Sequence, residues 1–366
     1  MTGNSMEINK GIKSQKSVFI TANFALDTGS GNVSHHEARA LAVVTELEKV
    51  VTEADTWAKL STLPHTPRAF LCDYWAAHEL KDCKVDLAFF NGSPFGMTQR
   101  LLKPAKTIVD IPAHNIELSV EEFERRNGIG SYPFEHMVEP FLWNMYSQHI
   151  QNADVVLCPS KLSAEYISKK LPLKNKMAVI PHGCFLPQES PVPSAEFSIA
   201  HVGVNSTDRG QFYLVQAWHK LKQNPKFSGN LVMIGRGTGL WLPFGVFSSE
   251  YVDNIGKVYN DCSAYVQPSV TEGFGIPVLE AMAYARPVIV TEGAGSCELV
   301  DDGKDGFIVP IRDPDAIKDK IEYFHDNPDE VKRMGKNARE KAEKYSWKII
   351  ENKYQKLIQE VLNEKS

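Results

Sequence analysis

The chain of 366 residues has few cysteines, and none of the six lies in a C-x-x-C pair. Such spacing argues against a disulfide framework and against a cysteine zinc site, so we expect reduced, buried thiols. No run of residues approaches the ~18 apolar residues of a membrane-spanning helix, and residues 1–16 lack the apolar stretch of a signal peptide. We therefore expect a cytoplasmic protein that contacts membranes at most peripherally.

Neither sign of charge dominates, because 45 acidic and 40 basic side chains leave a formal net charge of −5. A chain of this charge has no overall basic field that would attract nucleic acid or anionic lipid. Hydrophobic residues make up 43% of the sequence, which is ordinary for a globular protein. Length and composition together predict about two folded domains and exclude a disordered or collagen-like chain.

Several signatures of common enzymes are also missing. The sequence has no P-loop, no G-x-S-x-G and no H-E-x-x-H, so P-loop NTPase, serine hydrolase and zincin functions lack support. The D-x-D sequence at Asp313–Asp315 is typical of a helix N-cap with proline in the first turn rather than of a metal-chelating pair. We expect neither a metal nor a cofactor.

Short apolar runs alternate with helical patterns along the whole chain, which is the βαβ pattern of parallel sheets covered on both faces. A helix is predicted from His35 to about Val51, and another begins at Ser119, which forms a capping box with Glu122. Strands are predicted at 17–24, 85–91, 106–114, 153–160, 176–183, 198–204, 230–235, 264–268, 286–291 and 306–310.

Residues 184–197 interrupt this pattern with three prolines and no regular period, which is typical of an interdomain linker. We place a first α/β domain at 1–190, a second at 191–345 and a terminal helix at 346–366. One face of that helix carries an apolar stripe expected to pack on the body of the protein. Two such domains leave a cleft at the carboxyl ends of their strands, where open α/β sheets bind ligands. The stripe consists of Trp347, Ile350, Tyr354, Leu357, Ile358 and Val361.

The most informative segment is 267–298, where a predicted strand leads through T-E-G-F-G into a helix that begins at Ile276-Pro277. Gly273 and Gly275 allow a ligand to approach the backbone closely. The free N–H groups of the helix start suit a phosphate. Glu272 and Glu280 lie at E-x7-E spacing, and carboxylates accept hydrogen bonds from sugar hydroxyls. Taken singly, either glutamate could equally complement the helix dipole or cap the loop.

Residues 268–310 resemble the donor-site block of the family 4 glycosyltransferases, which have the GT-B fold. The resemblance implies two Rossmann-like domains whose parallel sheets face each other across a cleft. It implies a retaining, metal-independent transfer of a hexosyl or pentosyl group from a nucleotide sugar to a glycan, lipid-linked or small-molecule acceptor. The first domain would bind the acceptor, the second the donor, and the terminal helix would return to the first domain. We expect a UDP- or GDP-linked donor.

The resemblance also implies roles for residues at the matching positions of the second domain. Glu280 would hold the ribose hydroxyls, and Glu272 would hold the transferred sugar together with the backbone of Phe274 and Gly275. Backbone amides near Ile276 would meet the diphosphate.

Two further segments of the second domain fit this resemblance. Arg209 stands where the family has a lysine and can neutralise a diphosphate. Val204 occupies the place of the usual arginine, so one basic group is missing. Glycines after the strand at 230–235, Gly237 among them, would lie near the nucleotide base.

In the first domain, Gly29 and Gly31 occupy the place of the family's glycine-rich loop and could admit donor phosphate or acceptor. The same glycines form part of a G-x-G-x-x-G dinucleotide pattern, but the acidic residue expected ~20 residues further on is not evident, so we reject a nicotinamide dehydrogenase. His114 follows a predicted strand at the position of a histidine that the family often places beside the transferred sugar. It could equally be a structural hydrogen-bonding residue.

Three alternatives to a glycosyltransferase acting on a glycan, lipid or small molecule remain. The missing arginine at Val204 suits a non-catalytic nucleotide-sugar-binding subunit. The same fold also serves epimerases and phosphorylases. A cluster of lysines at 161–176 would suit a nucleic acid acceptor, although solvated surface lysines explain it more simply.

Overall fold

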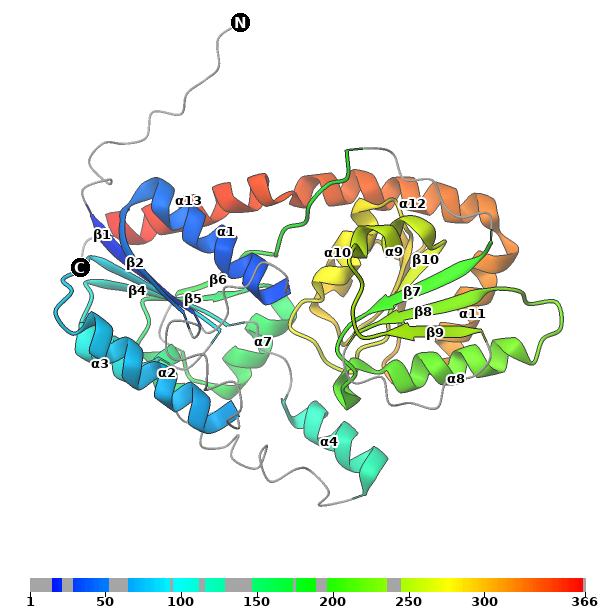
Figure 1. Ribbon diagram of the computed structural model, residues 1–366, viewed down its shortest axis with the longest axis horizontal. Coiled ribbons are helices and arrows are strands. Elements are labelled where there is room, and N and C mark those ends of the chain that lie inside the picture. Colours follow the sequence, from blue (N-terminus) through cyan, green and yellow to red (C-terminus); the bar gives the residue numbers. More distant parts are fainter. Residues whose placement is uncertain are drawn as a thin grey trace, which may run out of the picture.

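The computed structural model describes residues 15–21, 29–52, 65–92, 95–111, 116–128, 147–173, 176–188, 196–235 and 245–364. They form two α/β domains, each built on a six-stranded parallel sheet (Figure 1), so the predicted fold class is confirmed. The first domain comprises β1 (Lys16–Thr21), α1 (Gly29–Val44), β2 (Glu46–Thr52), α2 (His65–Leu80), β3 (Leu87–Asn91), α3 (Gly96–Leu102), β4 (Lys106–Asp110), α4 (Ile116–Asn127), β5 (Val155–Cys158), α7 (Lys161–Lys170) and β6 (Lys176–Val179).

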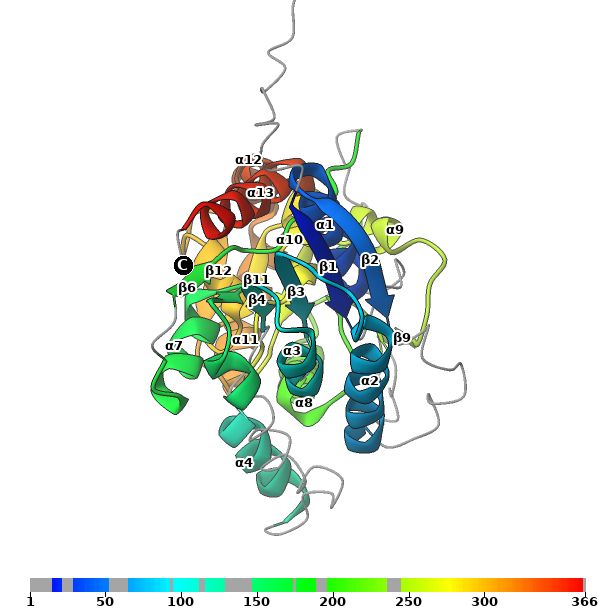
Figure 2. The same ribbon diagram turned by 90° about the vertical axis from the view of Figure 1, so that its left-hand side faces the viewer.

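The strand order of the first sheet is β2-β1-β3-β4-β5-β6. Neighbouring side chains on one strand point to opposite faces of the sheet, so Phe19 packs with α1 while Val18 and Ile20 pack with α2. Figure 2 shows α1 on one side of this sheet and α2, α3 and α7 on the other. Both faces of the sheet are covered, as its apolar strands require.

The strand order of the second sheet is β12-β11-β10-β7-β8-β9. Because β7 pairs with both β8 and β10, the chain order reverses between β7 and β10, and the carboxyl ends of these two strands mark the ligand-binding edge of such a sheet. The second domain comprises β7 (Ser198–Val202), η4 (Thr207–Arg209), α8 (Gln211–Lys222), β8 (Asn230–Ile234), β9 (Val246–Ser249), α9 (Ile255–Asp261), β10 (Ala264–Gln267), α10 (Ile276–Ala283), β11 (Val288–Thr291), η5 (Gly295–Leu299), β12 (Gly306–Val309), α11 (Pro314–Asp326), α12 (Pro328–Ala342) and η6 (Glu343–Tyr345).

The last helix, α13 (Trp347–Asn363), lies against the first domain, next to α1 (Figures 1 and 2). All six residues of the predicted apolar stripe are buried there. The chain reaches α13 by a crossing segment that pairs with residues after β6, where Cys184 N donates to Tyr345 O at 3.0 Å. A Cβ atom at Gly183 would lie 2.7 Å from the Trp347 ring, so only glycine allows the two segments to pack this closely.

Three local predictions are wrong. The helix expected at His35–Val51 begins earlier, at Gly29, and ends at Val44, and residues 46–52 form the edge strand β2. That strand buries only Val51, so its alternation of apolar and polar residues is weak. Strand β9 was not predicted, and it too is an edge strand.

The third wrong prediction is the capping box. Helix α4 begins at Ile116, so Ser119 lies inside it and is not its N-cap. Glu122, the other half of the expected box, is fully buried and faces the second domain. Its carboxylate accepts hydrogen bonds from Arg312 Nε at 2.9 Å and from the Tyr213 hydroxyl at 2.7 Å. The spacing predicted a capping role for Glu122, but its tertiary contacts make it part of the interface between the domains.

We expect Glu122→Gln to lower the free energy of unfolding by about 3 kcal/mol, because the fully buried carboxylate, which pairs with both Arg312 and Arg125, would become a neutral amide. The measurement is denaturant-induced unfolding of wild type and variant. Glu121→Gln is the matched control, since Glu121 pairs with Arg312 at 2.8 Å but its side chain is 58% exposed, and exposed pairs contribute about 0–1 kcal/mol. Equal losses in the two variants would contradict the assignment of Glu122 as a buried interdomain contact.

Candidate active site

The loop after β10 leads directly into α10 at the carboxyl edge of the second sheet. Gly275 precedes α10 with φ +96°, and Pro277 lies in the first turn as predicted. A Cβ atom at Gly275 would lie 3.0 Å from Ser296 Oγ, so both the space and the backbone angle favour glycine. None of the described side chains caps the first turn. Pro277 has no N–H and Val278 N donates to Gly275 O at 3.1 Å, so the Ile276 N–H is the amide of this turn that can meet an anion.

The carboxylate of Glu272 lies in this loop and is held on both sides. Its Oε2 accepts hydrogen bonds from Gln267 Nε2 at 2.7 Å and from Ser269 Oγ at 2.9 Å. Gln267 and Ser269 are fully buried, and the Tyr265 hydroxyl donates to Gln267 Oε1 at 2.5 Å, which orients the Gln267 amide. Sequence reasoning missed these three residues because their role depends on how the loop folds back over the strand.

Arg209 approaches the other oxygen of the same carboxylate. Its Nη1 lies 3.4 Å from Glu272 Oε1 and donates to the Thr271 carbonyl at 3.2 Å. Burial lowers the pKa of Arg209, but the carboxylates of Glu272 and Asp208 outweigh this effect and raise the pKa. The structure thus brings together two predicted site residues that follow different strands, β7 and β10.

Glu280 lies on α10, which begins at this loop. Its Oε2 accepts a hydrogen bond from the Tyr259 hydroxyl at 2.7 Å. Burial raises the pKa of Glu280, although the Tyr259 hydrogen bond acts in the opposite direction. Tyr259 is fully buried on α9 and therefore holds the carboxylate in one place.

Phe274 and Ile276 connect the loop to the first domain. The Phe274 ring packs edge-on against His182, with centroids 5.0 Å apart, and burial lowers the pKa of His182 to about 3. Ile276 packs against the cores of both domains. The Phe274 and Ile276 side chains therefore serve packing, unlike the Glu272 carboxylate of the same loop.

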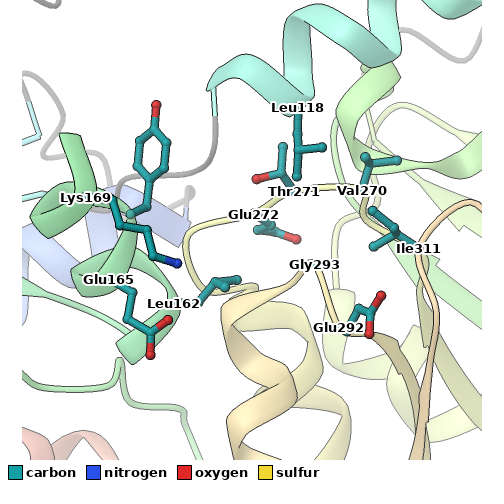
Figure 3. Close-up of a pocket in the computed structure, with 11 residues that line it drawn as sticks. Leu118, Leu162, Glu165, Lys169, Val270, Thr271, Glu272, Glu292, Gly293 and Ile311 are labelled. Carbon is teal, nitrogen blue, oxygen red and sulfur yellow. The ribbon is translucent and has the colours of Figure 1, made fainter.

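A cavity of about 230 Å³ lies between the domains beside this loop. Figure 3 shows the Lys169 side chain reaching toward Glu272 from the opposite wall. Helices α4 and α7 of the first domain form one wall, and loops of the second domain form the other. The lining residues are Leu118, Leu162, Glu165, Tyr166, Lys169, Val270, Thr271, Glu272, Glu292, Gly293 and Ile311.

Comparison with known proteins agrees with this geometry. Residues 185–341 match the family model described as "Glycosyl transferases group 1". The second domain is a group 1 glycosyltransferase domain. This assignment confirms the resemblance that residues 268–310 suggested.

Individual relatives of this glycosyltransferase domain are distant. An uncharacterized glycosyltransferase, MJ1178, of Methanocaldococcus jannaschii is 29% identical over 204 residues, which cover 54% of this chain and 56% of that protein. The chain thus spans about half the length of this curated relative. The sequence match therefore leaves the activity of the whole protein open.

Solved structures match over nearly the whole chain and confirm the GT-B architecture. Sucrose-phosphate synthase from Thermosynechococcus elongatus has a TM-score of 0.75, with 19% identity, and the match covers 94% of this chain and 98% of that one. Anabaena HepE in complex with UDP-glucose has a TM-score of 0.66, with 15% identity, over 94% of this chain and 100% of that one. At such identities the likeness shows the fold alone.

The structure does not place four of the predicted site residues beside the loop between β10 and α10 (268–275). His114 and Gly237 lie outside the described residues. Gly29 and Gly31 lie in the first turn of α1, so the expectation that they form a loop is wrong, although the predicted ligand contact stays a prediction. Glycine is a weak helix former, but it costs less in the first turn, where N–H groups have no intrahelical partner.

In the described part of the chain, no helix is long and apolar enough to cross a bilayer.

The first domain carries an unexpected pair of buried carboxyl groups, one at the carboxyl end of β4 and the other on α1. Asn91 Nδ2 donates to Glu37 Oε2 at 2.7 Å and to Asp110 Oδ2 at 3.0 Å. Burial, the charge of Asp110 and a hydrogen bond with Asp110 raise the pKa of Glu37, and burial raises the pKa of Asp110 to about 7. Neither carboxyl has a lysine or arginine partner among the described side chains, so the two groups retain a proton near neutral pH.

The carboxyl pair contributes a stability that falls by up to about 1.4 kcal/mol per pH unit between pH 5 and 7, because the folded state keeps a proton that the unfolded state releases. Asp110→Asn removes this contribution, whereas the buried histidines, whose pKa values burial lowers, titrate alike in both proteins. We therefore expect the free energy of unfolding of the wild type, minus that of Asp110→Asn, to fall over this range. The measurement is the free energy of unfolding at pH 5, 6, 7 and 8. Asp329→Asn, at a carboxylate 96% exposed, is the control and should keep the wild-type slope. An equally steep profile for Asp110→Asn would contradict the pairing.

Proposed function

We propose that this protein transfers a sugar from a nucleoside diphosphate sugar to an acceptor hydroxyl, with retention of configuration and without a metal. The observation that carries this proposal is the pairing of the fixed Glu272 carboxylate with the uncapped start of α10. A hydroxyl-rich sugar and a diphosphate need these two features side by side. The fold it shares with HepE, whose structure contains UDP-glucose, supports a nucleotide-sugar donor.

The departing diphosphate is the main charge that the site must stabilise. The Ile276 amide at the start of α10 and the Arg209 guanidinium are preorganised donors for it. Arg209 lies within salt-bridge distance of Glu272, so it can meet the phosphate next to the transferred sugar. Val204, at the end of β7, is 59% exposed and supplies no charge, so Arg209 carries the cationic contribution on this side.

Transfer with retention needs no separate base. The bond between the anomeric carbon and the phosphate oxygen breaks, and the acceptor oxygen forms a bond to the same face of that carbon. The acceptor proton passes to the departing phosphate oxygen. Glu272 holds the sugar hydroxyls during this exchange, and Glu280 holds the ribose.

The acceptor approaches from the interdomain cavity. This cavity is lined by Glu272 on one side and by α7 of the first domain on the other, so an acceptor in it lies between the two domains. Closure of the domains around both substrates excludes water and limits hydrolysis of the donor.

Glu280→Gln is expected to weaken binding of the nucleoside diphosphate about tenfold or more, because a charged acceptor of hydrogen bonds becomes neutral. The measurement is a thermal-shift and calorimetric panel of UDP-, GDP-, ADP- and dTDP-sugars, read for wild type and variant. Glu340→Gln, at an exposed carboxylate on α12, is the control. Unchanged affinity in a folded Glu280→Gln protein would refute the role of this carboxylate, and a flat panel for the wild type would refute the donor proposal.

Glu272→Gln is expected to reduce turnover about a hundredfold, since it removes the charge that faces the transferred sugar. The measurement is the rate at which nucleoside diphosphate is released from the nucleotide sugar that gives the largest thermal shift. Affinity for the nucleoside diphosphate without its sugar should change little in this variant. A wild-type turnover rate in the Glu272→Gln variant would show that Glu272 is not a catalytic residue.

A further inference from the structure

Two serines of the first domain donate hydrogen bonds to one carbonyl oxygen of the donor loop (268–275). Ser160, the N-cap of α7, donates from Oγ to Gly273 O at 2.7 Å, and Ser163 Oγ donates to the same oxygen at 3.1 Å. Both serines are 1% exposed. Gly273 belongs to the second domain, so these two hydrogen bonds form only when the domains are together.

The second domain is shaped to receive this end of α7. A Cβ atom at Gly295 would lie 2.2 Å from Gly273 O and 2.5 Å from Ser160 Oγ, so only glycine leaves room for the contact. The Glu298 carboxylate accepts hydrogen bonds from the backbone N–H groups of Lys161 at 3.0 Å and Leu162 at 2.7 Å. The second domain thereby satisfies amides at the start of a first-domain helix.

The bonded carbonyl sets the direction of a neighbouring amide. The peptide bond is planar and trans, so fixing Gly273 O toward the first domain points the N–H of Phe274 to the opposite side. Gly273 has no Cβ, so without these bonds its ψ angle, and with it this peptide plane, would have a wider range of orientations. On the far side of Phe274, Ser296 N donates to Phe274 O at 2.6 Å, so both peptide groups around Phe274 are held.

We propose that Ser160 and Ser163 are positioning residues for sugar transfer, which orient the Gly273–Phe274 peptide of the donor loop when the two domains close. This inference rests on the proposed function, because it is the transferred sugar that this backbone would hold. It makes the shape of the sugar-binding loop depend on the first domain. Glu280 and Tyr259 both belong to the second domain, so nucleotide binding does not depend on the two serines.

The test uses the full chain with Ser160→Gly and Ser163→Ala combined. Glycine replaces an N-cap serine at a cost of only a few tenths of a kcal/mol, so α7 is retained while both hydroxyls are lost. Ser160→Thr with Ser163→Ala is the rescue variant, because threonine restores one hydroxyl at the cap. Ser168→Ala, at an exposed serine on the same helix, is the control.

The first measurement is the affinity for UDP, or for GDP if GDP stabilises the protein more. The second is the rate at which the same nucleoside diphosphate is released from its sugar conjugate. We expect the double variant to lower the release rate about tenfold, as the loss of two hydrogen bonds implies. Its affinity for the nucleoside diphosphate should stay within about twofold of wild type, and the rescue variant should recover most of the rate.

Each other outcome is informative. A wild-type rate in the double variant would overturn the positioning role and leave the proposed function standing. Equal losses of rate and of nucleotide affinity would overturn it too, since the serines would then support the whole donor site. A wild type that binds nucleotide but releases none from any sugar conjugate would refute the proposed function, and the positioning role with it.

Discussion

The geometry of the site depends on how the Glu272 carboxylate is held. One oxygen accepts hydrogen bonds from two buried neutral side chains, Gln267 and Ser269, and the other faces the Arg209 guanidinium. A carboxylate with these fixed partners presents its remaining acceptor positions in one direction. The partners follow β7 and β10, the strands between which the chain order reverses, so the topology of the second sheet is what brings them together.

The two domains meet through contacts that carry both stability and shape. On one side of the cavity, the buried Glu122 carboxylate binds Arg312 and Tyr213 of the second domain. On the other side, the start of α7 packs against the loop between β10 and α10, where Gly295 leaves room for Ser160 to reach Gly273 O. These polar contacts, together with the packing of Phe274 and Ile276 against the first domain, set the relative position of the two domains.

The first domain has a feature that packing alone does not explain. Thr21, Asn91 and Asp110 are neighbours in register at the carboxyl ends of β1, β3 and β4, and Glu37 reaches them from α1. Two buried carboxyl groups without a cation among the described side chains cost stability at neutral pH. Such conflicts between stability and local chemistry are concentrated at functional sites, and this one lies at the ligand-binding edge of its sheet.

The alternation of strands and helices, the loop and proline that begin α10, and the E-x7-E spacing could be predicted from the residues alone. These features are local, since they follow from apolar periodicity and from the backbone preferences of glycine and proline. The folded chain was needed to show that Arg209 faces Glu272, that Glu122 is an interdomain contact rather than part of a cap, and that Ser160 and Ser163 reach Gly273. These contacts join residues 63 to 190 positions apart, and no local spacing encodes which distant donor meets which acceptor.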